Sequence, residues 1–175
     1  MERYILAKTV EEALDALEEY GDRARVINGG TDLILLLKDG KIKIDYLVDI
    51  TNITELNYIE NDDELIKVGA LVPHSGVEKS RVINEKAAVL AEASRAVGSP
   101  QVRNQGTVVG NIANASPAAD ASLALIALGA EAKVVHKNGE RIEKVENLFE
   151  GPGRTNLMSK ELITELRFQQ LGPGQ

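Results

Sequence analysis

Two glycine-bearing segments hold the residue types and spacing that are best suited to binding chemistry. The first glycine loop is residues 28–32 (Asn-Gly-Gly-Thr-Asp), and the second glycine loop is residues 106–111 (Gly-Thr-Val-Val-Gly-Asn). Because glycine has no Cβ, several backbone N–H groups can converge on one anion. A helix that begins after such a loop adds unpaired N–H groups and a partial positive charge. Two such loops in one small chain indicate a ligand with a diphosphate, held mainly by backbone.

Composition excludes several classes of protein. The chain has 175 residues, 43% of them apolar, which suffices for one large domain or two small lobes. A net charge of −7 and only 3% aromatic residues argue against a nucleic-acid partner. The chain has no cysteine, so it can ligate no iron–sulfur cluster, and its two histidines, His74 and His136, lack metal-ligand spacing. We expect no metal site, no membrane span and a cytoplasmic location.

The first fifty residues predict alternating strands and helices. Thr9 and Glu12 have the spacing of a capping box, and Gly21 is placed to end the helix that they begin. The order strand-helix-strand-helix-strand favours a small parallel sheet with right-handed crossovers. The expected strands are 3–7, 24–27 and 46–50, and the expected helices are 9–21 and 32–38.

The remaining residues predict a mixed, mostly antiparallel sheet with helices. Asn138-Gly139 is a strong hairpin signal between strands 133–137 and 140–145. A second hairpin is expected around Asn61, Asp62 and Asp63. The other expected elements are strands 56–59, 65–68 and 161–168 and helices 85–97 and 118–128. The fold class is α+β, with an N-terminal lobe at 1–55 and a second lobe at 56–175.

The motifs of other nucleotide-binding and hydrolytic sites do not occur. There is no Gly-x-Gly-x-x-Gly after a strand, no phosphate-binding P-loop and no Gly-x-Ser-x-Gly elbow. We therefore expect a carrier of a cofactor that supplies the chemistry, and no catalytic side chain. Asp32 is most often a helix cap, Thr31 could cap the same helix equally well, and Asp120 could cap the next one. Arg103 fits a phosphate partner or part of a salt bridge.

Four segments together resemble one known family. They are residues 27–33, 69–74, 101–120 and 161–163. The chain is similar to the FAD-binding medium subunit of molybdenum hydroxylases, the group of xanthine dehydrogenase and aerobic carbon monoxide dehydrogenase. The resemblance implies the two-lobed FAD-binding domain of the vanillyl-alcohol-oxidase type, with FAD held between the lobes.

The resemblance also implies which residues bind the cofactor. The two loops are expected to hold the diphosphate, Ser116 and Asp120 to lie near the ribityl chain or diphosphate, and Leu162 to lie near the isoalloxazine ring. The full expected set is Ile27, Asn28, Gly29, Gly30, Thr31, Asp32, Leu33, Thr107, Val108, Val109, Gly110, Asn111, Ile112, Ser116, Asp120 and Leu162.

Enzymes of this family pass electrons from molybdopterin through two [2Fe–2S] clusters to FAD, and from there to NAD or another acceptor. The resemblance thus implies an iron–sulfur small subunit and a molybdopterin large subunit as partners. Two alternatives remain, a stand-alone flavoprotein reductase of the same fold and a non-catalytic assembly module that holds no FAD.

Three departures from the family pattern stand out. Asn28 occupies a position where the family usually has a small residue, and Val109 occupies one where it usually has glycine. The family's further C-terminal domain, of about a hundred residues, falls outside this chain. We expect that domain to reside elsewhere, or the chain to be a fragment of a longer subunit.

Overall fold

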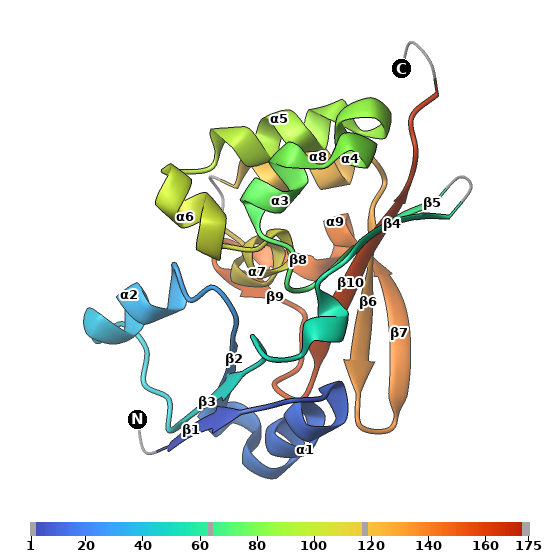
Figure 1. Ribbon diagram of the computed structural model, residues 1–175. Coiled ribbons are helices and arrows are strands. Elements are labelled where there is room, and N and C mark those ends of the chain that lie inside the picture. Colours follow the sequence, from blue (N-terminus) through green and yellow to red (C-terminus); the bar gives the residue numbers. More distant parts are fainter. Residues whose placement is uncertain (1–2, 63–64, 117–118, 173–175) are drawn as a thin grey trace.

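The computed structural model describes residues 3–62, 65–116 and 119–172 (Figure 1). A three-stranded parallel sheet has the order β1-β3-β2. Its strands are β1 (Arg3–Leu6), β2 (Ala24–Ile27) and β3 (Tyr46–Asp49), and α1 (Val10–Tyr20) and α2 (Leu33–Lys38) lie between them in the chain. The parallel sheet that the sequence predicted is confirmed.

Helix α1 forms as its sequence predicts. The Thr9 side chain accepts a hydrogen bond from the Glu12 backbone N–H at 3.1 Å, and the Glu12 carboxylate accepts one from the Lys8 N–H at 2.7 Å. These bonds satisfy backbone donors that the first helical turn leaves unpaired. Leu17 is buried on the inner face, and Gly21 ends the helix with φ 51°. The helix is thus fixed at both ends against the parallel sheet.

The second sheet has five antiparallel strands in the order β4-β5-β10-β6-β7. The long strand β10 lies in the middle, so its side chains are mostly buried. The strands are β4 (Ile59–Asp62), β5 (Leu65–Gly69), β6 (Glu131–His136), β7 (Gly139–Lys144) and β10 (Leu162–Gln169), and a separate hairpin consists of β8 (Phe149–Gly151) and β9 (Arg154–Thr155). Both predicted hairpins are confirmed. Asn61 and Asp62, expected in a turn, belong to strand β4, and Asp63 lies outside the described residues.

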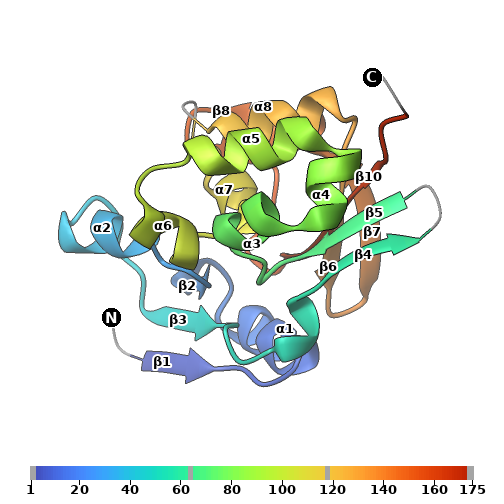
Figure 2. The same ribbon diagram turned by 45° about the horizontal axis from the view of Figure 1, so that its top comes forward.

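Helices gather at one end of this sheet. Figure 1 shows α5 and α8 together at the top of the view and the parallel sheet with α1 at the bottom, and Figure 2 shows the same arrangement after rotation. The helices after β5 are α3 (His74–Lys79), α4 (Arg81–Lys86), α5 (Ala88–Ala96), α6 (Pro100–Gln105), α7 (Val108–Asn114), α8 (Asp120–Ala127) and α9 (Val145–Leu148).

Three predictions of local structure were wrong. A single helix at 85–97 was expected, but the backbone turns at the fully buried Ala87 (φ −154°, ψ 51°) and divides the segment into α4 and α5. The strand expected at 56–59 begins only at Ile59, because a short 3₁₀ helix, η2 (Thr54–Leu56), precedes it. The second glycine loop was expected over 106–111, but residues 108–111 form the start of helix α7 (Val108–Asn114). The helix expected at 118–128 is present as α8 (Asp120–Ala127), and Ala118 lies outside the described residues.

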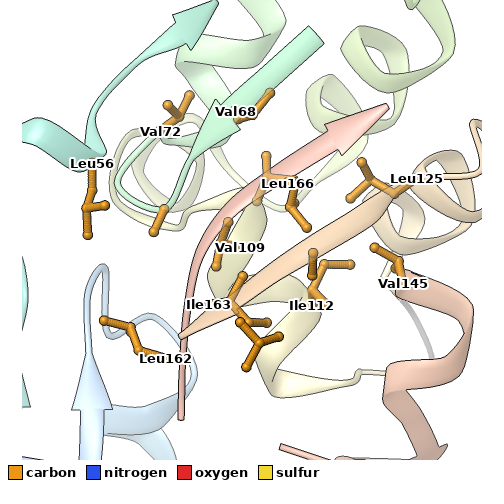
Figure 3. Packing of buried hydrophobic residues seen from close by; sticks show 14 of the residues in the cluster. Leu56, Val68, Val72, Val109, Ile112, Leu125, Val145, Leu162, Ile163 and Leu166 are labelled. Atoms are coloured by element: carbon orange, nitrogen blue, oxygen red, sulfur yellow. The ribbon is translucent and has the colours of Figure 1, made fainter. Parts of the chain in front are cut away.

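One hydrophobic core joins both sheets and the helices. Figure 3 shows side chains of α7, α8 and β10 meeting there, among them Ile112, Leu125 and Leu166. A second, smaller cluster packs α2 against the parallel sheet through Ile27, Ile44 and Leu47. The loop before α2 and the loop before α7 therefore both start from well-packed elements.

The two glycine loops are in direct backbone contact. An ideal Cβ on Gly29 would lie 1.9 Å from the carbonyl oxygen of Gln105, a separation that real Cβ atoms do not show. Only glycine permits this approach. The contact brings the loop after β2 onto the chain that enters α7, although Gly29 and Gln105 are 76 positions apart in the sequence.

The contact at Gly29 predicts a large effect of one methyl group. Gly29→Ala should lower the free energy of unfolding by about 3 kcal/mol, because the loops must separate to admit the new Cβ. Gly40→Ala is the matched control: Gly40 has φ 66° and no atom lies within 4 Å of the position that the new methyl group would take, so only backbone strain of about 1 kcal/mol is expected. Urea denaturation of the two variants measures both; equal losses would contradict the packing.

Candidate functional site

Each glycine of the two loops meets a different structural demand. Gly29 permits the close approach to Gln105, and Gly30 adopts φ 67°, a left-handed conformation that disfavours side chains. Gly110 lies within the first turn of α7, where a Cβ would be 2.9 Å from the Thr107 hydroxyl oxygen. That oxygen caps α7 by accepting a hydrogen bond from the Gly110 N–H at 3.0 Å.

A third segment holds the second glycine loop in place. The His74 N–H donates to the Gly106 carbonyl at 2.9 Å, and the Val108 N–H donates to the Val72 carbonyl at 3.3 Å. Pro73 and Thr107 form the bridge between these two bonds. The segment that follows β5 therefore fixes the backbone that enters α7.

The first glycine loop presents a row of unpaired donors. Among the described residues, no backbone or side-chain group accepts a hydrogen bond from the backbone N–H of Gly29, Gly30, Thr31, Asp32 or Leu33. These residues are half-buried or exposed, and the first N–H groups of a helix have no partner within the helix. Five consecutive unpaired N–H groups at the start of a helix make a site suited to an anion.

Both loops line one large cavity, of about 840 Å³. Most of the expected binding residues are brought together around it: Ile27, Asn28, Gly29, Gly30, Thr31, Asp32, Leu33, Thr107, Val109, Gly110, Asn111, Ser116, Asp120 and Leu162. Val108 and Ile112 differ from the expectation. Both are fully buried core residues that do not line the cavity, because they are four positions apart on the face of α7 turned toward the core. Figure 3 shows Ile112 on that face.

The carboxylates of Asp32 and Asp120 accept no hydrogen bond from the backbone at the starts of α2 and α8. Asp32 is exposed at the start of α2 and makes no capping hydrogen bond, and Asp120 begins α8 without capping it. The capping alternative for these two residues is therefore wrong in this structure. The backbone donors of the first glycine loop remain available to a ligand.

Arg103 has a structural role beside the cavity. Its guanidinium donates to Glu78 at 3.2 Å and to the carbonyl oxygens of Val97 and Gly98 at 3.1 Å each. Val97 and Gly98 line the cavity, so Arg103 shapes the wall between α5 and α6. This is the ion-pair alternative that the sequence allowed.

Sequence reasoning missed one wall of the cavity. The hairpin of β8 and β9 contributes Glu150, Gly153 and Arg154, and the Gly153 N–H donates to the Ala115 carbonyl at 2.9 Å. Arg154 makes no ion pair with any described residue, so its charge is available to an anionic ligand. The two glycines at 151 and 153 signalled a tight turn, but nothing in the sequence placed that turn beside α7.

Glu161 is a buried carboxylate at the edge of the cavity. Burial alone raises its pKa, but hydrogen bonds from Arg141, at 3.0 Å to each carboxylate oxygen, and from the Met158 N–H outweigh burial and hold the pKa below its usual value. The ionised carboxylate anchors the loop that leads into β10. Leu162, the residue expected near the isoalloxazine ring, follows directly.

His74 is a buried neutral imidazole. Its side chain is 2% exposed, and its Nδ1 atom has no hydrogen-bond partner among the described residues. Burial, followed by the charge of Arg103, lowers the pKa of His74 from 6.5 to about 4. The imidazole therefore carries no charge at neutral pH.

The lowered pKa of His74 predicts a pH dependence of stability. Below pH 6.5 the unfolded chain binds a proton that the folded chain refuses until about pH 4, so stability present above pH 6.5 is lost over this interval. The loss due to His74 is at most about 3 kcal/mol. In urea denaturation at pH 7.0 and 4.5, His74→Phe should lose less stability than the wild type. An equal loss in both proteins would show that His74 is not the group responsible.

Two features, a membrane-spanning helix and a metal-binding cluster, are absent from residues 3–62, 65–116 and 119–172. Within them no helix combines the length and the apolar content that crossing a membrane requires. The same residues include no cluster of three or more His, Asp or Glu side chains placed to hold a metal ion.

Comparison with known proteins places the chain in a family. Residues 1–168 match the model of the FAD binding domain in molybdopterin dehydrogenase. The chain is 35% identical over 163 residues to the glyceraldehyde dehydrogenase medium chain of Sulfolobus acidocaldarius, covering 93% of this chain and 58% of the relative. It is 30% identical over 171 residues to the carbon monoxide dehydrogenase medium chain of Hydrogenophaga pseudoflava, covering 98% and 60%.

Solved structures agree with this assignment. A carbon monoxide dehydrogenase structure from Hydrogenophaga pseudoflava has a TM-score of 0.96 and 30% identity, covering 99% of this chain and 60% of that one. Quinoline 2-oxidoreductase from Pseudomonas putida 86 has a TM-score of 0.93 at 25% identity, covering 98% and 60%. The chain thus spans about three fifths of the relatives that it matches. It belongs to the family of FAD-binding domains of molybdopterin dehydrogenases, the molybdenum hydroxylase group that the sequence resembled.

Proposed function

We propose that the two glycine loops hold the diphosphate of FAD, and that the chain acts as the electron-transfer part of a molybdenum hydroxylase complex. The observation that carries this proposal is the row of five N–H groups, from Gly29 to Leu33, that find no acceptor among the described residues and lie at the wall of a cavity of about 840 Å³. Backbone donors at a helix start suit a doubly charged diphosphate.

The residues around the cavity fit FAD in three further respects. Thr107 and Gly110, at the start of α7, line the same cavity beside the first glycine loop. The N–H groups of Val108 and Gly110 are already paired, so this helix start contributes mainly its partial positive charge. Arg154 supplies a cation that no described carboxylate pairs with. Leu162 and Met158 supply apolar surface at the end of the cavity near β10, which suits a flavin ring.

FAD, when bound, supplies the electron-transfer chemistry, and this chain binds and orients it. The loops hold the phosphates by backbone, and the helices behind them keep the loops rigid. Neither role needs a titrating side chain. Asp32 and Asp120 add negative charge beside the phosphates, so the cations and helix termini must outweigh them.

Charge placed at Gly30 should block the cofactor. Gly30→Asp brings a negative charge into the first glycine loop, where its Cβ would meet side-chain carbons of Ile27 and Ile34 at 3.1 and 3.2 Å. At an effective dielectric of about 20, two unit charges about 4 Å apart repel by roughly 4 kcal/mol, or near a thousandfold in affinity. Gly30→Asn is the control, since it has the same shape without the charge and asparagine tolerates the left-handed φ of 67°. FAD titration of both variants measures the difference. A dissociation constant for Gly30→Asp within threefold of Gly30→Asn would rule out this loop as the diphosphate site.

We further propose that electrons reach the flavin from an iron–sulfur subunit and leave to NAD or another acceptor. The relatives are named as medium chains or FAD subunits, which implies that companion subunits exist in their complexes. This chain has no cysteine, so a cluster that serves its flavin must be ligated by another chain. A cytoplasmic location belongs to the same proposal.

Reconstitution tests the relay. The FAD-loaded chain is mixed with the iron–sulfur and molybdopterin subunits, and reduction of the flavin by a hydroxylase substrate is followed by absorbance. Flavin reduction should require all three components. The control is the chain alone with the same substrate. Reduction of the flavin by substrate in that control would contradict the relay and favour a stand-alone reductase.

A further inference from the structure

The side chain of Asn28 connects three segments of the cavity wall. Its Nδ2 donates to the Ala70 carbonyl at 2.8 Å and to the Thr107 hydroxyl oxygen at 3.2 Å. Asn28 belongs to the first glycine loop, Ala70 follows β5, and Thr107 belongs to the second glycine loop. Both hydrogens of the carboxamide nitrogen are therefore used in linking the two loops and the segment between β5 and α3.

The bond to Thr107 continues into α7. The Thr107 hydroxyl oxygen that accepts from Asn28 also accepts from the Gly110 N–H at 3.0 Å and so caps that helix. Thr107 is 4% exposed and Asn28 is half-buried, so water competes little for these bonds. Because both bonds end on one oxygen, the link between the two loops and the cap of α7 depend on the same hydroxyl group.

The hydrogen bonds of Asn28 fix the orientation of the two loops, which the backbone contact between Gly29 and Gln105 does not. The contact between Gly29 and Gln105 limits how closely the loops approach, but van der Waals contact has little directional preference. Hydrogen bonds are directional and weaken steeply when they bend. The carboxamide of Asn28 therefore sets how the donors of the first glycine loop are aligned with the start of α7.

Other polar links between the parallel sheet region and the rest of the chain are more exposed. Lys137 pairs with Asp15, and Lys160 pairs with Glu18, with all four side chains between 41% and 52% exposed. Exposed ion pairs of this kind stabilise by at most about 1 kcal/mol and are screened by salt. They lie on α1 and the strand connections, away from the glycine loops, and cannot align them.

We propose that Asn28 is a positioning residue that aligns the two glycine loops before the cofactor arrives. Its carboxamide acts on the diphosphate through the loops that it joins, rather than by contact with the phosphates. The inference rests on the proposed FAD site. It gives a physical role to a residue that stands where the family usually has a small side chain.

The test replaces the carboxamide without changing its size. Asn28→Leu keeps the volume and removes both donors. Asn84→Leu is the matched control, because the Asn84 carboxamide also donates two hydrogen bonds, to the Glu78 and Ser80 carbonyls at 2.9 and 2.8 Å, far from the cavity. FAD titration of the 175-residue chain should show at least tenfold weaker binding for Asn28→Leu and a change within twofold for Asn84→Leu. FAD affinity within twofold of wild type in Asn28→Leu overturns the inference.

A second readout separates alignment from general stability. Without FAD, Asn28→Leu should lower the melting temperature more than Asn84→Leu, because Asn84 is exposed. The rise in melting temperature on adding FAD should shrink only in Asn28→Leu. If Asn28→Leu does not fold, hydrogen exchange in the wild type replaces it: the Asn28 carboxamide protons should exchange more slowly than those of Asn84, and equal rates overturn the inference. A wild-type chain that binds no FAD would instead refute the proposed function.

Discussion

The close backbone contact between Gly29 and Gln105 is the constraint on which the rest of the site depends. It holds the end of β2 against the turn between α6 and α7, so two helix starts face one cavity. Because the loops pack on each other, the donors from Gly29 to Leu33 cannot turn back to find partners among the described residues. The structure thus keeps these donors free of protein acceptors at the wall of the cavity, where a ligand can accept their hydrogen bonds.

The two sheets supply the rigidity that this contact needs. The first glycine loop leaves the carboxyl end of a parallel strand, a place where ligands often bind in α/β sheets. The second glycine loop is fixed by backbone hydrogen bonds to the segment that follows β5, and the Thr107 side chain caps the first turn of α7. A single hydrophobic core spans both sheets, so movement of one loop relative to the other would disturb buried side chains such as Ile112 and Leu166 (Figure 3).

Local signals in the sequence predicted the elements with clear ends. The capping pair Thr9 and Glu12 located α1, and Asn138-Gly139 located the hairpin of β6 and β7. The break at Ala87 was missed because alanine favours helix locally and the bend is imposed by its burial. Glycine spacing located the first loop, whereas residues 108–111 of the second expected loop form the first turn of α7. The contact between the two segments, the wall at Arg154 and the bonds of Asn28 join residues far apart in the chain, which no local pattern encodes.

The central claim is that both glycine loops bind the same ligand. Amide hydrogen exchange of the chain, with and without saturating FAD, tests it most directly, because unpaired N–H groups exchange fast and bound ones slowly. Peptides that cover residues 28–33 and 106–111 should both become protected when FAD binds, with the strongest protection in the first. Saturation with FAD that leaves either segment unprotected would contradict the account.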